Sequence, residues 1–113
     1  MFGIVYFTEP PSIGPLAFAK RVMDEGDFAQ LSCIATSGDE PLSLSWTFHG
    51  VSTKKLSSST NAMGISTTNL GTRMSILVMQ SVQHHHQGKY TCQAKNRAGV
   101  QVQSAELKVN GKL

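Results

Sequence analysis

Apolar side chains recur at every second position through much of this chain, and this spacing predicts β-strands rather than helices. From Ala29 to Ala35 the alternation places Leu31 and Cys33 on the same side as both ends of the run. Because successive side chains of a strand point to opposite faces, each such run buries one face. Turns rich in glycine, asparagine and aspartate separate the runs, so the pattern predicts an all-β sandwich or barrel.

The same alternation assigns an apolar inward set to the remaining runs, so one contiguous core is expected. The inward residues are Leu42, Leu44, Trp46, Phe48, Leu77, Met79, Val82, Tyr90, Cys92, Ala94, Ala105, Leu107 and Val109. Residues 52–62 are rich in serine, threonine and lysine, and we predict that they form a mobile loop.

Length and composition exclude several classes of protein. A chain of 113 residues has room for one domain. Its 40% hydrophobic and 15% charged residues exclude a disordered, highly charged chain. No apolar run approaches the roughly 18 residues of a membrane span. The formal net charge of +3 is too small and too scattered for a nucleic-acid groove, so nucleic acid is not an expected partner.

The two ends differ in character from the chain between them. Residues 1–9 begin with an apolar run, 1–7, which Glu9 and the following proline pair interrupt. The segment fits the remnant of a signal peptide, a flexible tail or a first strand. Residues 111–113 are expected to be a linker at which a further domain would begin. The folded domain is therefore predicted to span residues 10–110.

A small set of residues gives this chain a resemblance to a known family. Cys33, Trp46 and Cys92, with Tyr90 two positions before the second cysteine, resemble the immunoglobulin pattern and its tyrosine corner. The turn 96–99 is similar to that of the intermediate, or I-set, subclass. The resemblance spans nearly the whole chain. It implies a two-sheet sandwich of seven to eight strands, with one sheet of strands A, B, E and D and the other of A′, G, F and C.

Three further stretches, residues 37–46, 64–67 and 104–110, resemble the Down syndrome cell adhesion molecule (Dscam) family. The likeness is to the seventh immunoglobulin domain, or to the equivalent first domain of shortened arthropod (chelicerate-type) forms. In that family the domain is a variable homophilic module of neuronal recognition on a single-pass membrane protein. The resemblance implies a homodimer in trans, paired antiparallel through the ABED sheet. It also implies neighbouring immunoglobulin and fibronectin type III domains, and no cofactor.

The resemblance also implies a disulfide between Cys33 and Cys92, which would close a loop of about 60 residues worth roughly 4 kcal/mol in the chain-entropy account. A disulfide packed on Trp46 indicates secretion or a cell surface. The alternative is a pair of buried thiols, as in cytosolic I-set domains of muscle proteins. No asparagine stands in a glycosylation sequon, which leaves the sheet faces free of N-glycan.

The run His84-His85-His86 resembles a metal-binding tract, but consecutive side chains of a turn point in different directions. We expect no metal there. We interpret the run as a solvated turn that gains charge below about pH 6.5. In the I-set, an aspartate four residues before the tyrosine pairs with an arginine. His86 occupies that position and cannot make the same ion pair.

The sequence contains no motif of nucleophilic, zinc-dependent or phosphate chemistry. We therefore expect no enzymatic activity, no cofactor and no small-molecule substrate. The pairs Lys20-Arg21 and Lys54-Lys55 are interpreted as solvated charges rather than heparin or lipid sites.

Strands B and E have outward positions that are unusually apolar, and parity assigns them to one face. The predicted homophilic interface is Phe28, Gln30, Ser32, Ile34, Ser66, Thr68, Met74, Ile76, Val78 and Gln80. The outward residues of strands C and F are all polar by contrast. An apolar patch with a polar rim marks an interaction site more often than not. The alternatives are a different register, or cover by the N-terminal segment.

Charges at the rim of this patch would set specificity. Arg21 and Arg73 of one copy would face Asp24 or Glu25 of the other, and a wrong partner would be rejected because it brings like charges together. Two other functions stay open. A heterophilic receptor or immune-recognition domain would bind ligand through its end loops, 37–41 and 96–100. An intracellular I-set spacer would have reduced cysteines and would not self-associate.

Overall fold

The computed structural model describes residues 8–50, 53–56 and 63–111. The predictions made for residues 1–7 and for 112–113 lie outside these ranges. So does most of the loop predicted over 52–62, of which residues 53–56 are described.

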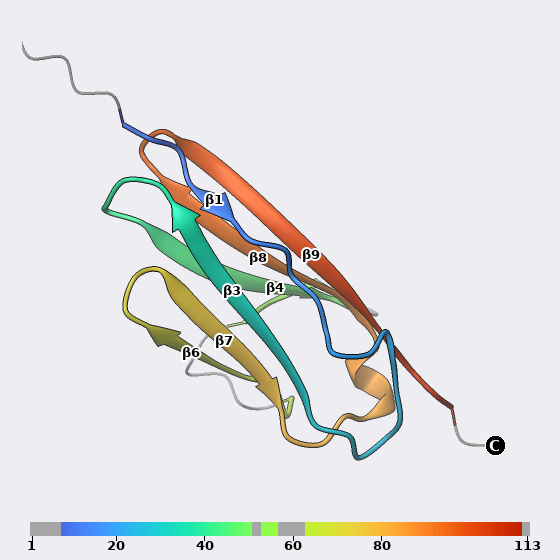
Figure 1. Cartoon of the computed structure of the whole chain (residues 1–113). Helices are drawn as coiled ribbons and strands as arrows, with labels where there is room; N and C mark the ends of the chain where they lie inside the picture. The colour runs from blue at the N-terminus through green and yellow to red at the C-terminus, as the bar shows by residue number, and fades with distance from the viewer. Residues whose placement is uncertain (1–7, 51–52, 57–62, 112–113) are drawn as a thin grey trace, which may run out of the picture.

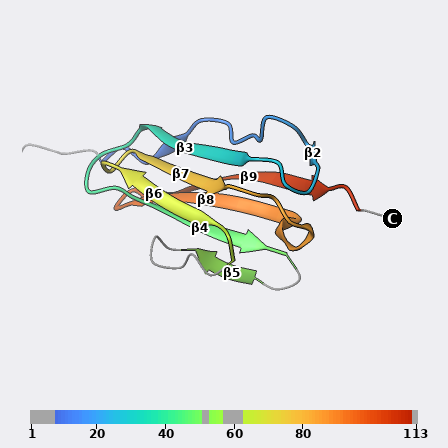
Figure 2. The ribbon, with the colours of Figure 1, turned by 90° about the horizontal axis from the view of Figure 1, so that it is seen from below.

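Within these ranges, nine strands form two sheets that face each other (Figure 1). The strands are β1 (Ser12–Ile13), β2 (Val22–Met23), β3 (Ala29–Ser37), β4 (Ser43–His49), β5 (Thr53–Leu56), β6 (Ser66–Leu70), β7 (Met74–Met79), β8 (Gly88–Asn96) and β9 (Gly99–Val109). The order is β1-β3-β7-β6 in one sheet and β2-β9-β8-β4-β5 in the other, with β5 at an outer edge (Figure 2). The predicted sandwich with ABED and A′GFC sheets is confirmed.

The N-terminal segment contributes to both sheets. β1 pairs antiparallel with β3, and β2 pairs parallel with β9. The chain therefore changes sheets between Ile13 and Val22. The backbone oxygen of Arg21 accepts a hydrogen bond from the Lys108 N–H at 3.1 Å, which holds this crossing against β9.

The inward residues predicted from alternation form the core. Ala29, Leu31, Cys33 and Ala35 of β3 are all buried, as are Leu77 and Met79 of β7. The facing positions of the second sheet are also buried; they are Trp46, Phe48, Tyr90 and Cys92. Leu44 and Ala105 are partly buried and pack against this cluster.

The loop prediction over residues 52–62 is wrong for 53–56, which form β5. This strand pairs with β4, so that Leu56 lies opposite Trp46 and Lys55 lies opposite Thr47. Leu56 is buried, because it covers the edge of the core beside the tryptophan. The strand is short and carries two lysines, so its single buried apolar residue, Leu56, does not produce a recognisable alternation in the sequence. It raises the strand count above the expected seven to eight.

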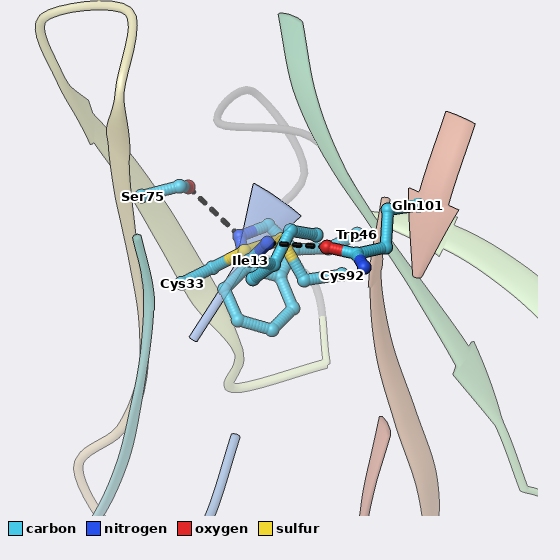
Figure 3. Close-up of a disulfide and its surroundings, with 6 residues drawn as sticks. All are labelled: Ile13, Cys33, Trp46, Ser75, Cys92 and Gln101. Carbon is cyan, nitrogen blue, oxygen red and sulfur yellow. Dashed lines mark hydrogen bonds between the residues drawn. A yellow bond between two sulfur atoms is a disulfide. The ribbon is translucent and has the colours of Figure 1, made fainter. Parts of the chain in front are cut away.

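A disulfide joins the two sheets at the centre of the core (Figure 3). It links Cys33 of β3 to Cys92 of β8, the pairing that the resemblance implied. Trp46 packs beside it, and its indole N–H donates a hydrogen bond of 2.8 Å to the Ser75 hydroxyl on β7. Ser75 is fully buried, so the two sheets are connected by a covalent bond and a polar contact at one level.

The tyrosine corner is present. The Tyr90 hydroxyl donates to the backbone oxygen of His86 at 2.6 Å, and Phe48 stacks on the Tyr90 ring with centroids 4.6 Å apart. Burial raises the pKa of the Tyr90 phenol well above its usual value, so the hydroxyl stays a donor at physiological pH.

The interpretation of all three histidines as a solvated turn is wrong for His86. His84 and His85 are exposed, but His86 is buried, with both ring nitrogens engaged. Its Nδ1 accepts the Gln83 N–H at 2.9 Å, and its Nε2 lies 2.7 Å from the Met63 carbonyl oxygen, to which it donates. A neutral imidazole has one donor and one acceptor, so this tautomer satisfies both partners. His86 thus joins the turn before β8 to the chain that enters β6.

We predict that Ser75→Ala destabilises the oxidised domain by about 1–3 kcal/mol, because it leaves the buried indole N–H of Trp46 without an acceptor. Urea unfolding measures the change. Ser43→Ala, at an exposed position of β4, is the matched control and should stay within about 0.5 kcal/mol of wild type. Equal effects of the two substitutions would show that the contact has no energetic role.

We predict that the free energy of unfolding falls as the pH drops below about 6.5. Desolvation by burial lowers the pKa of His86 below its unfolded value of 6.5; the Met63 carbonyl opposes this shift and His85 adds to it. The unfolded state therefore binds the proton first, and stability present above pH 6.5 is lost as the pH falls toward the folded pKa. His86→Gln should flatten this slope between pH 5 and 7, whereas His85→Gln should keep most of it, because His85 is the smallest of the three causes of the pKa shift. A slope unchanged in His86→Gln would contradict the prediction.

Candidate recognition surface on the four-stranded sheet

Strand register gathers the outward side chains of β3, β7 and β6 into cross-strand rows. β7 lies between the other two strands, so each of its outward residues has a neighbour on both sides. The three rows are Ile34–Met74–Leu70, Ser32–Ile76–Thr68 and Gln30–Val78–Ser66. We call this surface, together with Phe28 and Gln80 at one end, the ABED face.

The apolar residues of the ABED face are open to solvent to different degrees. Phe28 is 55% exposed, Leu70 53% and Ile34 44%. Met74, Ile76 and Val78 are half-buried, because strands flank them on both sides. Cross-strand neighbours lie about 5 Å apart, so these side chains form one continuous patch.

The ABED face carries no charge at the outward positions that the rows define. Its polar residues are amides and hydroxyls, and Gln30 donates to the Ser32 hydroxyl at 2.9 Å. Such a surface can be covered by a protein without the desolvation of an ion, which is the expensive part of burying polar groups.

The phase predicted for strand D places Ser66 and Thr68 outward, and the register gives the same placement. Ser66 lies opposite Val78 and Thr68 opposite Ile76, while Thr67 between them is buried. Leu70 was not among the predicted residues. Continuing the alternation from Ser66 and Thr68 would have found it, and it completes the one row that is apolar throughout.

The four rim charges lie in different places. Arg73 is at the end of the sheet where β3 finishes, 2.7 Å from the Gly38 carbonyl and 3.7 Å from a Glu40 carboxylate oxygen. Asp24 and Glu25 lie at the opposite end, before β3. Arg21 lies beside β9, so its assignment to this rim needs correction. The crossing of the N-terminal segment moves it to the other sheet.

The outer surface of the five-stranded sheet is more mixed than strands C and F alone predicted. Ser43, Ser45, Thr47, Lys89, Thr91, Gln93 and Lys95 do form a polar surface there. However, β9 adds Val102 at 51% exposure and Val100 at 54%. The contrast between the two sheets lies in charge as much as in hydrophobicity.

Within the described ranges, no three histidine, cysteine, aspartate or glutamate side chains come together to hold a metal ion. The same residues contain no helix of the length and apolar character needed to cross a membrane.

The sequence matches the profile of the immunoglobulin domain family over residues 10–96, and the chain belongs to this family. Two relatives indicate a particular group within this family. The chain is 34% identical over 101 residues to the cell adhesion molecule Dscam1 of Drosophila melanogaster, and 36% identical over 107 residues to Dscam2 of the same organism. The alignments cover 89% and 95% of this chain, but only 5% of each relative.

Solved structures lead to the same group. The crystal structure of the Dscam1 Ig7 domain, isoform 5, superimposes with a TM-score of 0.81 at 32% identity, covering 89% of this chain and 97% of that one. Isoform 9 gives the same score and identity and is covered completely. The chain is thus an immunoglobulin domain with Dscam homologues and with Dscam1 Ig7 domains as structural neighbours, as the sequence motifs predicted.

Proposed function

We propose that this chain is a recognition domain on the outside of a cell, where it mediates homophilic adhesion by pairing with a second copy of itself through the ABED face. The observation that carries the proposal is an uncharged, largely apolar face on a sheet whose opposite face already fills the core. An exposed patch of this kind marks an interaction site. The adhesion role of its Dscam relatives supports the same function.

The pairing that fits this face is antiparallel about a two-fold axis across β7. Ile76 would then lie near the axis, and Met74 would face Val78 of the second copy. A two-fold interface uses the same patch twice, so a patch must complement itself. The half-buried apolar residues of β7 meet this condition, because near the axis an apolar side chain of one copy contacts an apolar side chain of the other.

The same symmetry supports the remaining rim charges as specificity residues. Antiparallel pairing brings the end that carries Arg73 toward the end of the second copy that carries Asp24 and Glu25. Opposite charges there would favour the correct partner, and a change of sign would reject it. The contact of Arg73 with Gly38 and Glu40 holds the guanidinium in place in the single copy.

The full-length setting is part of the proposal. The Dscam relatives are cell adhesion molecules of which this chain spans 5%. We infer a domain over residues 10–110, neighbouring immunoglobulin and fibronectin type III domains, and a single membrane span elsewhere in the protein. The disulfide supports an oxidising, extracellular location.

We predict that the oxidised domain dimerises in sedimentation equilibrium and that Val78→Asp weakens the dimer on the order of 100-fold. The two-fold axis places two unpaired carboxylates in one interface, and burying a charge without a partner is costly. Val102→Asp is the matched control, because it makes the same change on the other sheet and should dimerise like wild type.

A wild-type domain that stays monomeric at high micromolar concentration would contradict self-pairing of this domain and favour ligand binding through the end loops. Equal weakening by Val78→Asp and Val102→Asp would contradict the assignment to the ABED face. Near-ultraviolet circular dichroism checks that each variant keeps its packed core.

A further inference from the structure

The outer surface of the five-stranded sheet gathers lysines that are far apart in the sequence. Lys89 and Lys95 are exposed on β8, Lys55 on β5 and Lys108 on β9. Register places them all outward. Lys95 pairs with Ser43, and Lys55 pairs with Thr47, whose other neighbour is Thr91. We call this surface the basic face.

Hydroxyl groups and the Gln93 amide lie between Lys89 and Lys95, with Val100 and Val102 exposed beside them on β9. Thr47 lies beside Thr91, and Thr91 lies beside Ser104, with the last two hydroxyls 2.8 Å apart. Lys89 and Lys95 are six residues apart on one strand, which is a separation of about 20 Å. The basic face is therefore an elongated, gently twisted surface with charges spread along it and hydrogen-bonding groups between them.

Negative charge is nearly absent from the basic face. Glu106, opposite Lys89, is the one carboxylate at its outward positions among the residues that the structure describes. The other acidic residues lie at the two ends of the domain. Glu9, Asp39 and Glu40 stand at the end where β3 finishes, whereas Asp24, Glu25 and Asp27 come before β3. The net charge of +3 is thus a sum over a basic face, two ends that carry the other acidic residues, one of them together with Arg73, and the uncharged ABED face.

A groove of about 620 Å³ extends the basic face between β9 and the segment that crosses from β1 to β2. Arg21 and Lys108 line it together with Glu106, Ser104 and the apolar residues Leu16, Phe18 and Val22. It adds a fifth cation, Arg21, which the crossing carries to this sheet. The groove therefore offers a polar and partly apolar shelf next to the lysines.

We propose that the basic face binds a sulfated polysaccharide, which gives Arg21 and Lys55 a role that their two short basic pairs did not indicate in the sequence. A linear chain with repeated sulfates matches cations spread over about 20 Å, and its hydroxyls match the serine and threonine side chains between them. A single phosphate or carboxylate would need cations that converge on one point, and these lysines do not. The ABED face lies on the opposite sheet, so the polysaccharide and a second copy of the domain could bind at once.

We predict that the domain binds immobilised heparin in 0.15 M salt and that Lys89→Ala/Lys95→Ala weakens this binding about tenfold or more. The slope of log affinity against log salt should fall by about two, because two fewer counterions are displaced from the polyanion. The matched control, Asn69→Glu/Ser81→Glu, lowers the net charge by the same amount at two exposed positions, on β6 and after β7, that belong neither to the basic face nor to the predicted interface. It should stay within about threefold of wild type, because the Debye length of about 8 Å is shorter than the distance across the two sheets.

Three results would overturn the proposal: no heparin binding by the wild type, equal weakening by the two double variants, or unchanged binding to desulfated heparin. Binding to vesicles rich in anionic phospholipid without binding to heparin would replace the polysaccharide with a membrane surface. Circular dichroism and thermal unfolding confirm the fold of each variant. Because heparin binding is measured with monomeric domain, its failure would leave self-pairing through the ABED face unaffected.

Discussion

The disulfide between Cys33 and Cys92, together with the indole of Trp46, fixes how the two sheets face each other. The disulfide joins the inner faces of β3 and β8. The Trp46 indole, on β4, adds a hydrogen bond to the Ser75 hydroxyl on β7. With these residues inside, every alternate residue of β3 and β7 must point away from the core. A shift of β7 by one residue would bury Ile76 and expose Leu77, so the central contact also determines the composition of the outer surface.

The outer surfaces of the two sheets consequently have different physical characters. The ABED face has apolar side chains and no charge, whereas the basic face has lysines separated by hydroxyls. The first suits contact with another protein surface, since little desolvation opposes it. The second suits a highly charged polymer, since release of counterions drives such binding. One domain of this size therefore offers two surfaces whose interactions respond in opposite ways to salt.

Local alternation made the fold and much of the ABED face predictable. Parity along one strand identifies Ile76 and Val78 as outward without any knowledge of the neighbouring strands. Leu70 also follows from parity, once the alternation is continued from Ser66 and Thr68, whereas the basic face depends on register between strands, which parity does not specify. The burial of a polar side chain could not be predicted either. His86 is buried because the Met63 carbonyl and the Gln83 N–H form hydrogen bonds with its ring, and nothing in the run of three histidines distinguishes the third from the others. Arg21 was misplaced because its segment changes sheets.

That change of sheets divides the first strand into two pieces of two residues each, β1 and β2. A long unpaired strand at the edge of a sheet is a template for indefinite growth by addition of further strands. Here the N-terminal segment leaves the edge of each sheet after one or two paired residues. The edges at β1 and β2 therefore expose few backbone groups to which a further strand could bind. The broad faces of the two sheets are then the surfaces left for contact with another molecule, and there a side-chain substitution changes the contact without altering the backbone.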